Sequence, residues 1–575
     1  MIRRTRNLTS MATKAVQVDN TTAVDGFTPS AVGSSDQSKP LRFLVIGAGS
    51  RGHAYAEGVT HGQTTSASIY AVAEPQAFKR SEFGQKYIWG AQGIPRQDQQ
   101  FVSWREWLRW ELERRRQQQA AGEHHDHHVD DPNGRSQLVG VDGVFVCTLD
   151  ETHVEIMQAI APLQLHILCE KPLATSLTDC LSIYRALVPV GGPSSAPSKV
   201  FSIGHVLRYS QHNLALRQLL LVDRVIGDLV SMDHCEPVGW WHFAHSYVRG
   251  NWRRQTAHGD GSLLTKSSHD VDFVLWLLSS PPPGAPRDTP PHLPRSIASM
   301  GSLTQFRPER KPAAAGAATN CLSCAVEADC EYSARKIYRD LHLARRVTKW
   351  PVDIVCPDIE DVLHSSGMVA AEALLLDRLR EDYDRMTTAD ADIAARPWYG
   401  RCVYEADNSV CDHQVVTISW DDDLLPSDRS RIAKTASIRM IAPTEKQCER
   451  RGRVYGTEGE IEYDSHTIRV YSFGTQSVST IEISTSAQDK KSHGGGDVGL
   501  TSAFVSAVDA VENQGWDVRD AQAHYIGCTL EEAVRSHAVV FAAEEARRDE
   551  KVVRWKEWWD EKCRSFDSTT DSAFL

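Results

Sequence analysis

Short apolar runs separated by helix-compatible stretches characterise the first third of the chain. Residues 41–46 carry five apolar side chains in six positions, which is typical of a short buried strand. Further strands of this kind are expected at residues 67–74, 141–148, 166–170 and 199–205, and a helix is expected at residues 176–188. Strands that alternate with helices predict βαβ units and therefore a parallel sheet.

The pattern changes after about residue 405, where apolar and polar positions alternate. Alternating segments occur at residues 414–420, 436–441, 453–455, 460–463 and 480–484. They predict half-buried strands of an antiparallel sheet. Amphipathic helices are expected at residues 500–511 and 530–547, so the second half is predicted to be α+β, with helices covering one face of its sheet.

A glycine-rich turn follows the first predicted strand. Its G-x-G-x-x-G spacing is formed by Gly47, Gly49 and Gly52, and a helix is expected directly afterwards. Such glycines permit a tight turn, let a pyrophosphate approach the backbone and let the helix pack close to the strand, while the helix N-terminus offers N–H groups to phosphate. The motif therefore predicts dinucleotide binding by these glycines, together with Ser50 and Arg51 of the same turn.

An acidic residue, Glu74, ends the second predicted strand. A carboxylate at this position can accept hydrogen bonds from the adenosine ribose hydroxyls. This favours NAD over NADP as the cofactor, although Lys79 and Arg80 stand close enough in sequence to receive a 2′-phosphate. The alternative is a solvated strand end without a ligand.

The length of 575 residues exceeds what a single core usually fills, which predicts two domains with insertions. The predicted organisation is a disordered tail at residues 1–38, a dinucleotide-binding domain at 39–206 with an insertion at about 104–134, an α+β domain at 207–550 with a cysteine-bearing insertion at about 305–400, and a C-terminal tail at 551–575. The clustered histidines at residues 123–128 predict a solvated loop, with a metal site as the alternative.

The composition narrows the classes of protein. The net charge of −12 argues against a general nucleic-acid binder, and no apolar run approaches the roughly 20 residues that a membrane helix needs. Thirteen cysteines, an odd number scattered along the chain, suit a reducing compartment better than a disulfide framework. These features predict a cytoplasmic protein without nucleic-acid or membrane partners, and the basic residues 1–14 leave a mitochondrial presequence as the alternative.

The end of the strand predicted at residues 166–170 carries the strongest candidate for catalysis. Glu170, Lys171 and Pro172 follow one another there, and the carboxyl ends of strands line the ligand site in doubly wound folds. The ammonium of Lys171 can hydrogen-bond a substrate hydroxyl and stabilise the alkoxide as hydride leaves. Glu170 can contact the cofactor ribose or hold Lys171. The alternative is a surface Lys-Pro turn.

Three segments in this order resemble the Gfo/Idh/MocA oxidoreductases: the glycine turn, residues 147–153 and residues 170–172. The resemblance resumes at 204–209, 261–278 and 456–462. It implies the fold class α/β, with an N-terminal Rossmann doubly wound parallel sheet and a C-terminal α+β domain with a large, mostly antiparallel open sheet that often mediates homo-oligomerisation. It also implies an NAD(P)-dependent dehydrogenase acting on a carbinol carbon of a sugar, polyol or derivative, with Thr148 and His153 in the cofactor site.

The same resemblance assigns the catalytic residues. The family lysine falls on Lys171 and the family histidine on His269. Many members carry Asp four residues before that histidine, whereas Thr265 stands there in this chain and cannot act as a general base at neutral pH. Proton transfer is then expected from His269, assisted by Lys266 or Asp270. The alternatives are a histidine that only shapes the pocket and, for the whole protein, a non-catalytic NAD(P)-binding sensor or regulator.

Two further groups of residues complete the expectations. Polar and aromatic side chains of the kind that sugar sites use are Arg208, Tyr209, Asn251, Trp252 and Arg253, although surface loops have the same composition. A structural zinc site is predicted at Cys321, Cys324, Cys330 and Cys402, with Cys402 preferred over Cys356 and Cys411 as the fourth ligand. The cluster also resembles a cysteine-bearing subgroup of the family. Free thiols and an iron–sulfur or redox role are the alternatives.

Overall fold

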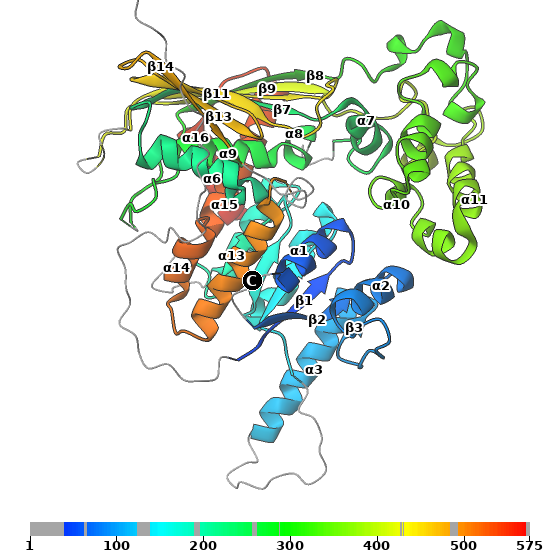
Figure 1. Ribbon diagram of the computed structural model, residues 1–575, viewed down its shortest axis with the longest axis horizontal. Helices are drawn as coiled ribbons and strands as arrows, with labels where there is room; N and C mark the ends of the chain where they lie inside the picture. Colours follow the sequence, from blue (N-terminus) through cyan, green and yellow to red (C-terminus); the bar gives the residue numbers. More distant parts are fainter. Residues whose placement is uncertain are drawn as a thin grey trace, which may run out of the picture.

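The computed structural model describes residues 39–61, 66–122, 139–188, 196–255, 261–286, 288–425, 428, 431–483 and 493–570. The predicted tail at residues 1–38 and the histidine-rich stretch at 123–128 lie outside the described residues. Two sheets, each covered by helices, lie at opposite ends of the molecule in Figure 1. A third, mainly helical lobe lies beside the second sheet, at the upper right of the same view.

The first sheet is parallel, with strand order β3-β2-β1-β4-β5-β6. Its strands are β1 (Leu41–Ile46), β2 (Ala67–Ala73), β3 (Gln100–Phe101), β4 (Gly143–Val146), β5 (His166–Cys169) and β6 (Phe201–Ile203). Its helices are α1 (Ser50–His61), α2 (Ala77–Tyr87), α3 (Trp104–Gly122), α4 (His153–Ile160) and α5 (Leu177–Leu187). The order reverses direction between β1 and β4, so the predicted doubly wound sheet is confirmed, with its ligand-binding edge at the carboxyl ends of these strands.

The second sheet has nine strands in the order β14-β13-β12-β11-β7-β10-β9-β8-β15. Their bounds are β7 (Leu229–Pro237), β8 (Ser296–Ser302), β9 (His413–Trp420), β10 (Lys434–Ile441), β11 (Arg451–Gly456), β12 (Gly459–Tyr463), β13 (Thr467–Ser472), β14 (Ser477–Glu482) and β15 (Val553–Arg554). Within the described strands, β10 and β7 run parallel and the other neighbours antiparallel. The large, mostly antiparallel sheet is therefore confirmed, and burial alternates along β9 and β10 as the period of two requires.

Helices cover one face of the second sheet (Figure 1). They include α6 (Gln211–Arg217), α8 (Ser262–Thr265), α9 (Ser268–Leu278) and α15 (Leu530–Arg548). Every residue of α9 is buried, and α15 begins with a capping box in which Thr529 and Glu532 satisfy each other's backbone N–H groups. Side chains of both sheets join one continuous apolar core, so the two domains are packed together through these helices.

The chain returns to the first sheet near its C-terminus through α13 (Gly496–Glu512) and α14 (Val518–Ala521). Helix α13 packs so closely on α1 that a methyl group at Gly58 would lie 2.7 Å from Cβ of Thr501. The division predicted at residues 206 and 207 is therefore incomplete, because α13 packs on the dinucleotide-binding unit although it belongs to the second half of the sequence.

A lobe with its own apolar core occupies the predicted cysteine-bearing insertion. It contains short helical turns and α10 (Val352–Val355), α11 (Ile359–Arg380), which is interrupted at Gly367, and α12 (Asp390–Ala394). Helix α7 (Trp240–Phe243) lies between the second sheet and this lobe in Figure 1. Cys321 and Cys356 are buried in the core of the lobe.

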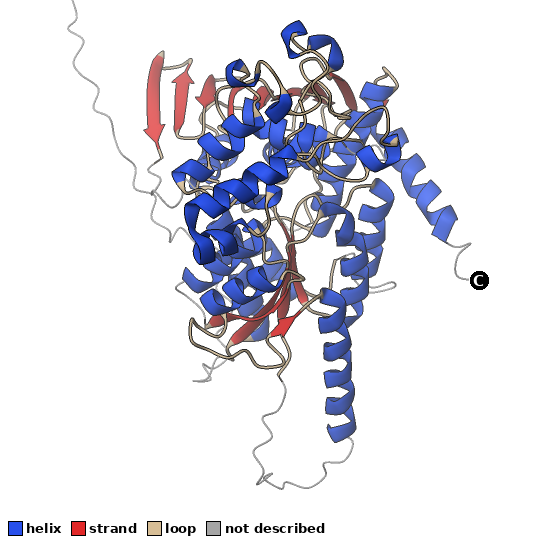
Figure 2. Cartoon of the chain, turned by 90° about the vertical axis from the view of Figure 1, so that its right-hand side faces the viewer, coloured by secondary structure: helices blue, strands red, loops and turns tan. Residues whose placement is uncertain are grey.

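The C-terminal residues form regular structure over most of their length. Strand β15 pairs with β8 at the sheet edge, and α16 (Trp555–Thr570) follows it and runs outward toward the C-terminus in Figure 2. Trp555 stacks on Trp559 with ring centroids 5.6 Å apart, and Trp555 and Trp558 are both buried. The predicted tail was wrong here, because tryptophans at helical spacing supply an apolar face. None of the helices in the described ranges is long and apolar enough to span a bilayer.

Candidate functional site

The glycine turn between β1 and α1 has the backbone geometry that its sequence predicts. Gly47 has φ of +95°, and a Cβ there would lie 2.5 Å from the carbonyl oxygen of Cys147. A Cβ at Gly52 would lie 2.2 Å from the carbonyl oxygen of Gly47, so both positions exclude a side chain. A Cβ at Gly49 would meet nothing within 4 Å. The backbone at Gly49 is therefore open to a ligand, directly before the first turn of α1.

Glu74 extends from the end of β2 to the same turn. Its Oε2 accepts a hydrogen bond from the backbone N–H of Ala48 at 2.9 Å, and its Oε1 accepts one from Gln76 at 2.9 Å. The cations that were candidates for a 2′-phosphate are already engaged: the Arg80 guanidinium donates to the carbonyl oxygen of Glu74, and Nζ of Lys79 lies 4.0 Å from Oδ2 of Asp353. The adenosine end of the predicted site thus presents a negative charge.

Arg51 forms an ion-pair cluster behind the turn. Its Nε lies 2.5 Å from Oε1 of Glu170, and its Nη1 lies 2.7 Å from Oδ1 of Asp497, at the start of α13. The hydroxyl of Tyr55 also donates to Glu170. Burial acts to raise the pKa of Glu170, but the charge of Arg51 and the hydrogen bonds from Tyr55 and Arg51 together outweigh it, and the pKa is lowered. Glu170 is therefore an anion that holds Arg51, and it contacts Lys171 through the backbone N–H at 3.0 Å.

His153 links the two loops that follow β4 and β5. It is fully buried, and its ring nitrogens lie 2.8 Å from the carbonyl oxygen of Pro172 and 3.2 Å from that of Thr148. The hydroxyl of Thr152 donates to the hydroxyl of Thr148 at 2.7 Å. These contacts fix the position of the loop that carries Thr148 beside the turn that carries Lys171.

Lys171 reaches from the first domain into the second. Its ammonium donates a hydrogen bond to the carbonyl oxygen of Thr265 at 2.8 Å. The hydroxyl of Thr265 is engaged with the carbonyl oxygen of Gly261 at 3.0 Å. Burial lowers the pKa of Lys171, partly offset by the negative charges of Glu170 and Asp150. Lys171 therefore lies at the junction of the two domains, and its ammonium group loses a proton more readily than that of an exposed lysine.

Asp150 is an acidic group at this junction that the sequence reasoning left without a role. It begins the short 3-10 turn Asp150–Thr152 after β4, and only 7% of it is exposed. The indole N–H of Trp252, from the second domain, donates to its Oδ2 at 2.9 Å. Burial raises the pKa of Asp150, opposed by the charges of His153 and Lys171. The sequence feature that could have indicated Asp150 is its position after a predicted strand, two residues beyond Thr148.

The other two predicted catalytic residues differ in their surroundings. His269 is buried, its Nδ1 has no hydrogen-bond partner, and burial together with the charge of Lys171 holds its pKa well below the ordinary value. Lys266 donates to Sγ of Cys448 at 2.9 Å and lies 3.2 Å from Oε1 of Glu236. Burial lowers the pKa of Lys266, but Cys448 and Glu236 outweigh it and the pKa is raised. His269 is therefore neutral, and Lys266 is a cation with protein partners.

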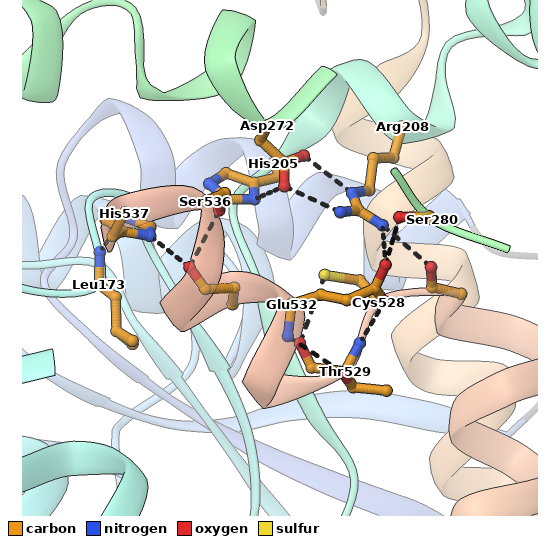
Figure 3. Close-up of polar contacts among 12 residues, drawn as sticks. Leu173, His205, Arg208, Asp272, Ser280, Cys528, Thr529, Glu532, Ser536 and His537 are labelled. Carbon is orange, nitrogen blue, oxygen red and sulfur yellow. Dashed lines mark hydrogen bonds and ion pairs between the residues drawn. The ribbon is translucent and has the colours of Figure 1, made fainter. Parts of the chain in front are cut away.

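A buried ion pair joins Arg208 to Asp272 (Figure 3), which lies three residues after His269 on α9. Nε and Nη2 of Arg208 each lie 2.8 Å from an oxygen of Asp272, and Nδ1 of His205 lies 3.0 Å from Oδ1 of the same carboxylate. Within the described residues, His205, Asp272 and Cys528 form a group of three potential metal ligands. The guanidinium of Arg208 already neutralises this carboxylate, so the arrangement is that of a salt bridge and not of a metal site.

Three residues that were predicted to contact substrate, Arg208, Tyr209 and Arg253, are instead hydrogen-bonded within the protein. Arg208 also donates to the carbonyl oxygen of Gly527 at 3.0 Å, and the Tyr209 hydroxyl donates to that of Ile526 at 2.9 Å. Arg253 donates to Asp407 and to backbone carbonyl oxygens, with 4% of it exposed. The polar groups of these three side chains form hydrogen bonds within the protein. Of the five predicted residues, Trp252 lies beside Asp150, and Asn251 is exposed.

The cysteines of the lobe do not have the geometry of a zinc site. The buried side chain of Arg249 donates to Sγ of Cys321 at 3.4 Å, and Cys330 and Cys402 lie close enough to help raise its pKa. A zinc ion bound at about 2.3 Å from each sulfur needs the sulfurs close together, yet no three cysteines of the described chain have their sulfurs within 4.8 Å of one another. Burial also raises the pKa of Cys402 to about 11, which disfavours the thiolate. The predicted zinc ligands, including Cys324, therefore do not fit the metal in this arrangement.

Comparison with known proteins agrees with this geometry. Residues 41–191 match the family described as "Oxidoreductase family, NAD-binding Rossmann fold". Inositol 2-dehydrogenase 2 of Saccharopolyspora erythraea is 31% identical over 149 residues, which are 26% of this chain and 38% of the relative. The 1,5-anhydro-D-fructose reductase of Ensifer adhaerens is 30% identical over 150 residues, 25% of this chain and 41% of the relative. The chain thus matches about two fifths of the length of these relatives.

Solved structures extend the likeness to both domains. Levoglucosan dehydrogenase in complex with NADH superposes with a TM-score of 0.52 at 13% identity, over 89% of this chain and 98% of that one. An oxidoreductase from Agrobacterium radiobacter in complex with NAD⁺, L-tartaric acid and magnesium gives a TM-score of 0.51 at 10% identity, over 90% and 98% of the two chains. At this identity the likeness establishes the fold.

Gly47 and Gly49 belong to one turn but differ in their surroundings, so they make a matched pair of variants. Gly49→Ala is expected to leave thermal stability unchanged and to lower NADH affinity, because the added methyl meets open space where a pyrophosphate would approach. Gly47→Ala is expected to lower stability by about 1–3 kcal/mol, because it strains a left-handed residue. Thermal melts and fluorescence titration with NADH measure both effects. Unchanged NADH affinity in Gly49→Ala would contradict the proposed position of the phosphates.

Loss of the buried ion pair is expected to destabilise the protein strongly. Asp272→Asn leaves the buried charge of Arg208 with only the longer contact to Glu532 at 3.9 Å, which costs about 3–5 kcal/mol. The exposed pair of Asp377 and Arg380 gives the control, since Asp377→Asn should change stability by less than about 1 kcal/mol. Urea unfolding followed by tryptophan fluorescence measures the difference. Equal midpoints for the two variants would show that Asp272 has no special structural role.

Proposed function

We propose that this chain, whose residues 41–191 are the NAD-binding domain of a Gfo/Idh/MocA family oxidoreductase, transfers hydride between nicotinamide and a carbinol carbon of a sugar, a polyol or a derivative. The observation that carries the proposal is that one sheet edge combines an open glycine turn, a carboxylate at the end of β2 and Lys171 after β5. The names of the relatives, inositol 2-dehydrogenase and 1,5-anhydro-D-fructose reductase, support the substrate class.

The residues present fit a dinucleotide. The backbone at Gly49 and the first turn of α1 would hold the pyrophosphate, and Glu74 would accept hydrogen bonds from the adenosine ribose. NAD is preferred over NADP in this proposal, because Glu74 repels a 2′-phosphate and Arg80 is engaged with backbone carbonyls. When bound, the nicotinamide supplies the hydride acceptor or donor.

Lys171 and His269 would contact the substrate hydroxyl. The ammonium of Lys171 has one hydrogen bond to Thr265, which leaves further N–H groups to stabilise negative charge on the substrate oxygen. The unpartnered Nδ1 of His269 offers a neutral imidazole nitrogen for a hydrogen bond to the same substrate. Lys266 is proposed to act on these groups only through its charge, since Cys448 and Glu236 occupy its side chain.

Homo-oligomer formation stays a prediction, and the second sheet is the surface that supports it. Its strands expose the apolar side chains of Val230, Met300 and Val478, of which Met300 is 76% exposed. Exposed apolar side chains on the open face of a large sheet are typical of a surface that pairs with a second copy.

Lys171→Met is the direct test of catalysis. Its turnover with a panel of myo-inositol, levoglucosan and 1,5-anhydrofructose is expected to fall by about 10²–10⁴-fold, with NADH affinity retained. Absorbance of the reduced nicotinamide measures turnover, and Lys556→Met, at a side chain that is 83% exposed, is the control. A wild-type protein that binds NADH without turnover of any substrate would support the alternative of a sensor.

Glu74 should determine the choice of cofactor. Glu74→Ala removes the charged acceptor for the ribose and is expected to weaken NADH binding by about 1.5–3 kcal/mol, roughly 10–100-fold. Glu74→Gln keeps an acceptor but removes the charge, so it should mainly improve NADPH binding. Titrations of both variants with both cofactors check this. An unchanged NADH to NADPH affinity ratio in both variants would refute the assignment of the ribose to Glu74.

A further inference from the structure

The proposed reaction needs a group that takes the hydroxyl proton, and the expected groups do not provide one. The hydroxyl of Thr265 donates to the carbonyl oxygen of Gly261 and cannot act as a general base at neutral pH. His269 has a pKa held well below the ordinary value by burial and by the charge of Lys171, so it binds a proton poorly. Lys266 is held as a cation by Cys448 and Glu236. A proton acceptor must therefore come from another element.

Asp150 is placed to fill this role. Strands β4 and β5 are neighbours, so the turn that begins with Asp150 and the turn that carries Lys171 lie side by side at the carboxyl edge of the sheet. The indole of Trp252 donates to Oδ2 of the carboxylate at 2.9 Å and stacks on Tyr247, with ring centroids 5.9 Å apart. A buried carboxylate beside Lys171 is thereby fixed from both domains.

The charges around this pair favour proton exchange. Burial raises the pKa of Asp150 and lowers that of Lys171, so both move from their ordinary values toward neutrality. The titratable groups that face Asp150 are His153, Lys171 and Tyr247. Those that face Lys171 also include Glu170, Lys266 and Arg51. A carboxylate whose protonated form is favoured by burial is a better base than an exposed one.

We propose that Asp150 is the catalytic acid and base of this protein. This proposal rests on the proposed oxidoreductase function. During oxidation, the substrate O–H bond breaks and its proton passes to the carboxylate of Asp150. The electron pair left on the oxygen would form the second bond of the carbonyl as the C–H bond breaks, and the oxidised nicotinamide of a dinucleotide held at Gly49 and Glu74 would accept the hydride. Asp150 then releases the proton to solvent, and reduction reverses these steps.

The test compares Asp150→Asn with Glu151→Gln. Asn keeps an oxygen that can accept from Trp252 but cannot accept a proton at neutral pH, and Glu151 is an exposed acid in the same turn. Asp150→Asn is expected to lose about 10²–10⁴-fold in turnover, with NADH affinity and melting temperature close to those of wild type. In Asp150→Ala, added formate or acetate should restore part of the turnover. Glu151→Gln should match wild type.

A second readout needs neither substrate nor cofactor. In protein labelled with ¹³C at the aspartate carboxyl carbons, one resonance should titrate above the ordinary range and should be absent from Asp150→Asn. If Asp150→Asn turns over like wild type, or if its carboxyl titrations are those of wild type, the role of Asp150 is overturned while the oxidoreductase function stands. If the wild-type protein binds NADH but transfers no hydride to the substrate panel, both proposals fall together.

Discussion

The buried ion pair between Asp272 and Arg208 is the interaction on which the rest of the molecule depends. The carboxylate of Asp272 pairs with both Nε and Nη2 of Arg208, and it lies beside His205, whose ring stacks on that of His537 at a centroid distance of 5.5 Å (Figure 3). Those residues come from the end of the first sheet, from α9 and from α15. Because a lone charge in this interior would be costly, the three elements are held in one arrangement.

This arrangement determines the geometry of the site. Helix α9 carries His269 one turn from Asp272, so the position of the ion pair fixes the imidazole relative to Lys171. His537 reinforces the same relation from the other side, since it accepts a hydrogen bond from the backbone N–H of Leu173, two residues after Lys171. Arg51 adds a second connection, because its guanidinium joins Glu170 to Asp497 on α13. The site is thus built by contacts between distant parts of the chain.

Features that depend on local sequence were predictable. The apolar pattern predicted the first strand and the position of Glu74, and the spacing of glycines predicted the tight turn. The alternation of apolar and polar residues predicted the second sheet. The structural role of Arg208 was not predictable, because its partner Gly527 lies 319 positions away. The same holds for Asp150, whose chemistry depends on Trp252 from the other domain. The cysteine spacing suggested zinc, whereas the fold places Arg249 among those thiols.

The central claim is that the turn at Gly49 seats a dinucleotide whose nicotinamide reaches the junction of the two domains. The most direct measurement is an experimental structure of the protein with NADH. We expect the pyrophosphate against the backbone of Gly49, the adenosine ribose at Glu74 and the nicotinamide beside Lys171 and Asp150. A dinucleotide bound elsewhere, or a protein that takes up no NADH at saturating concentration, would contradict the account.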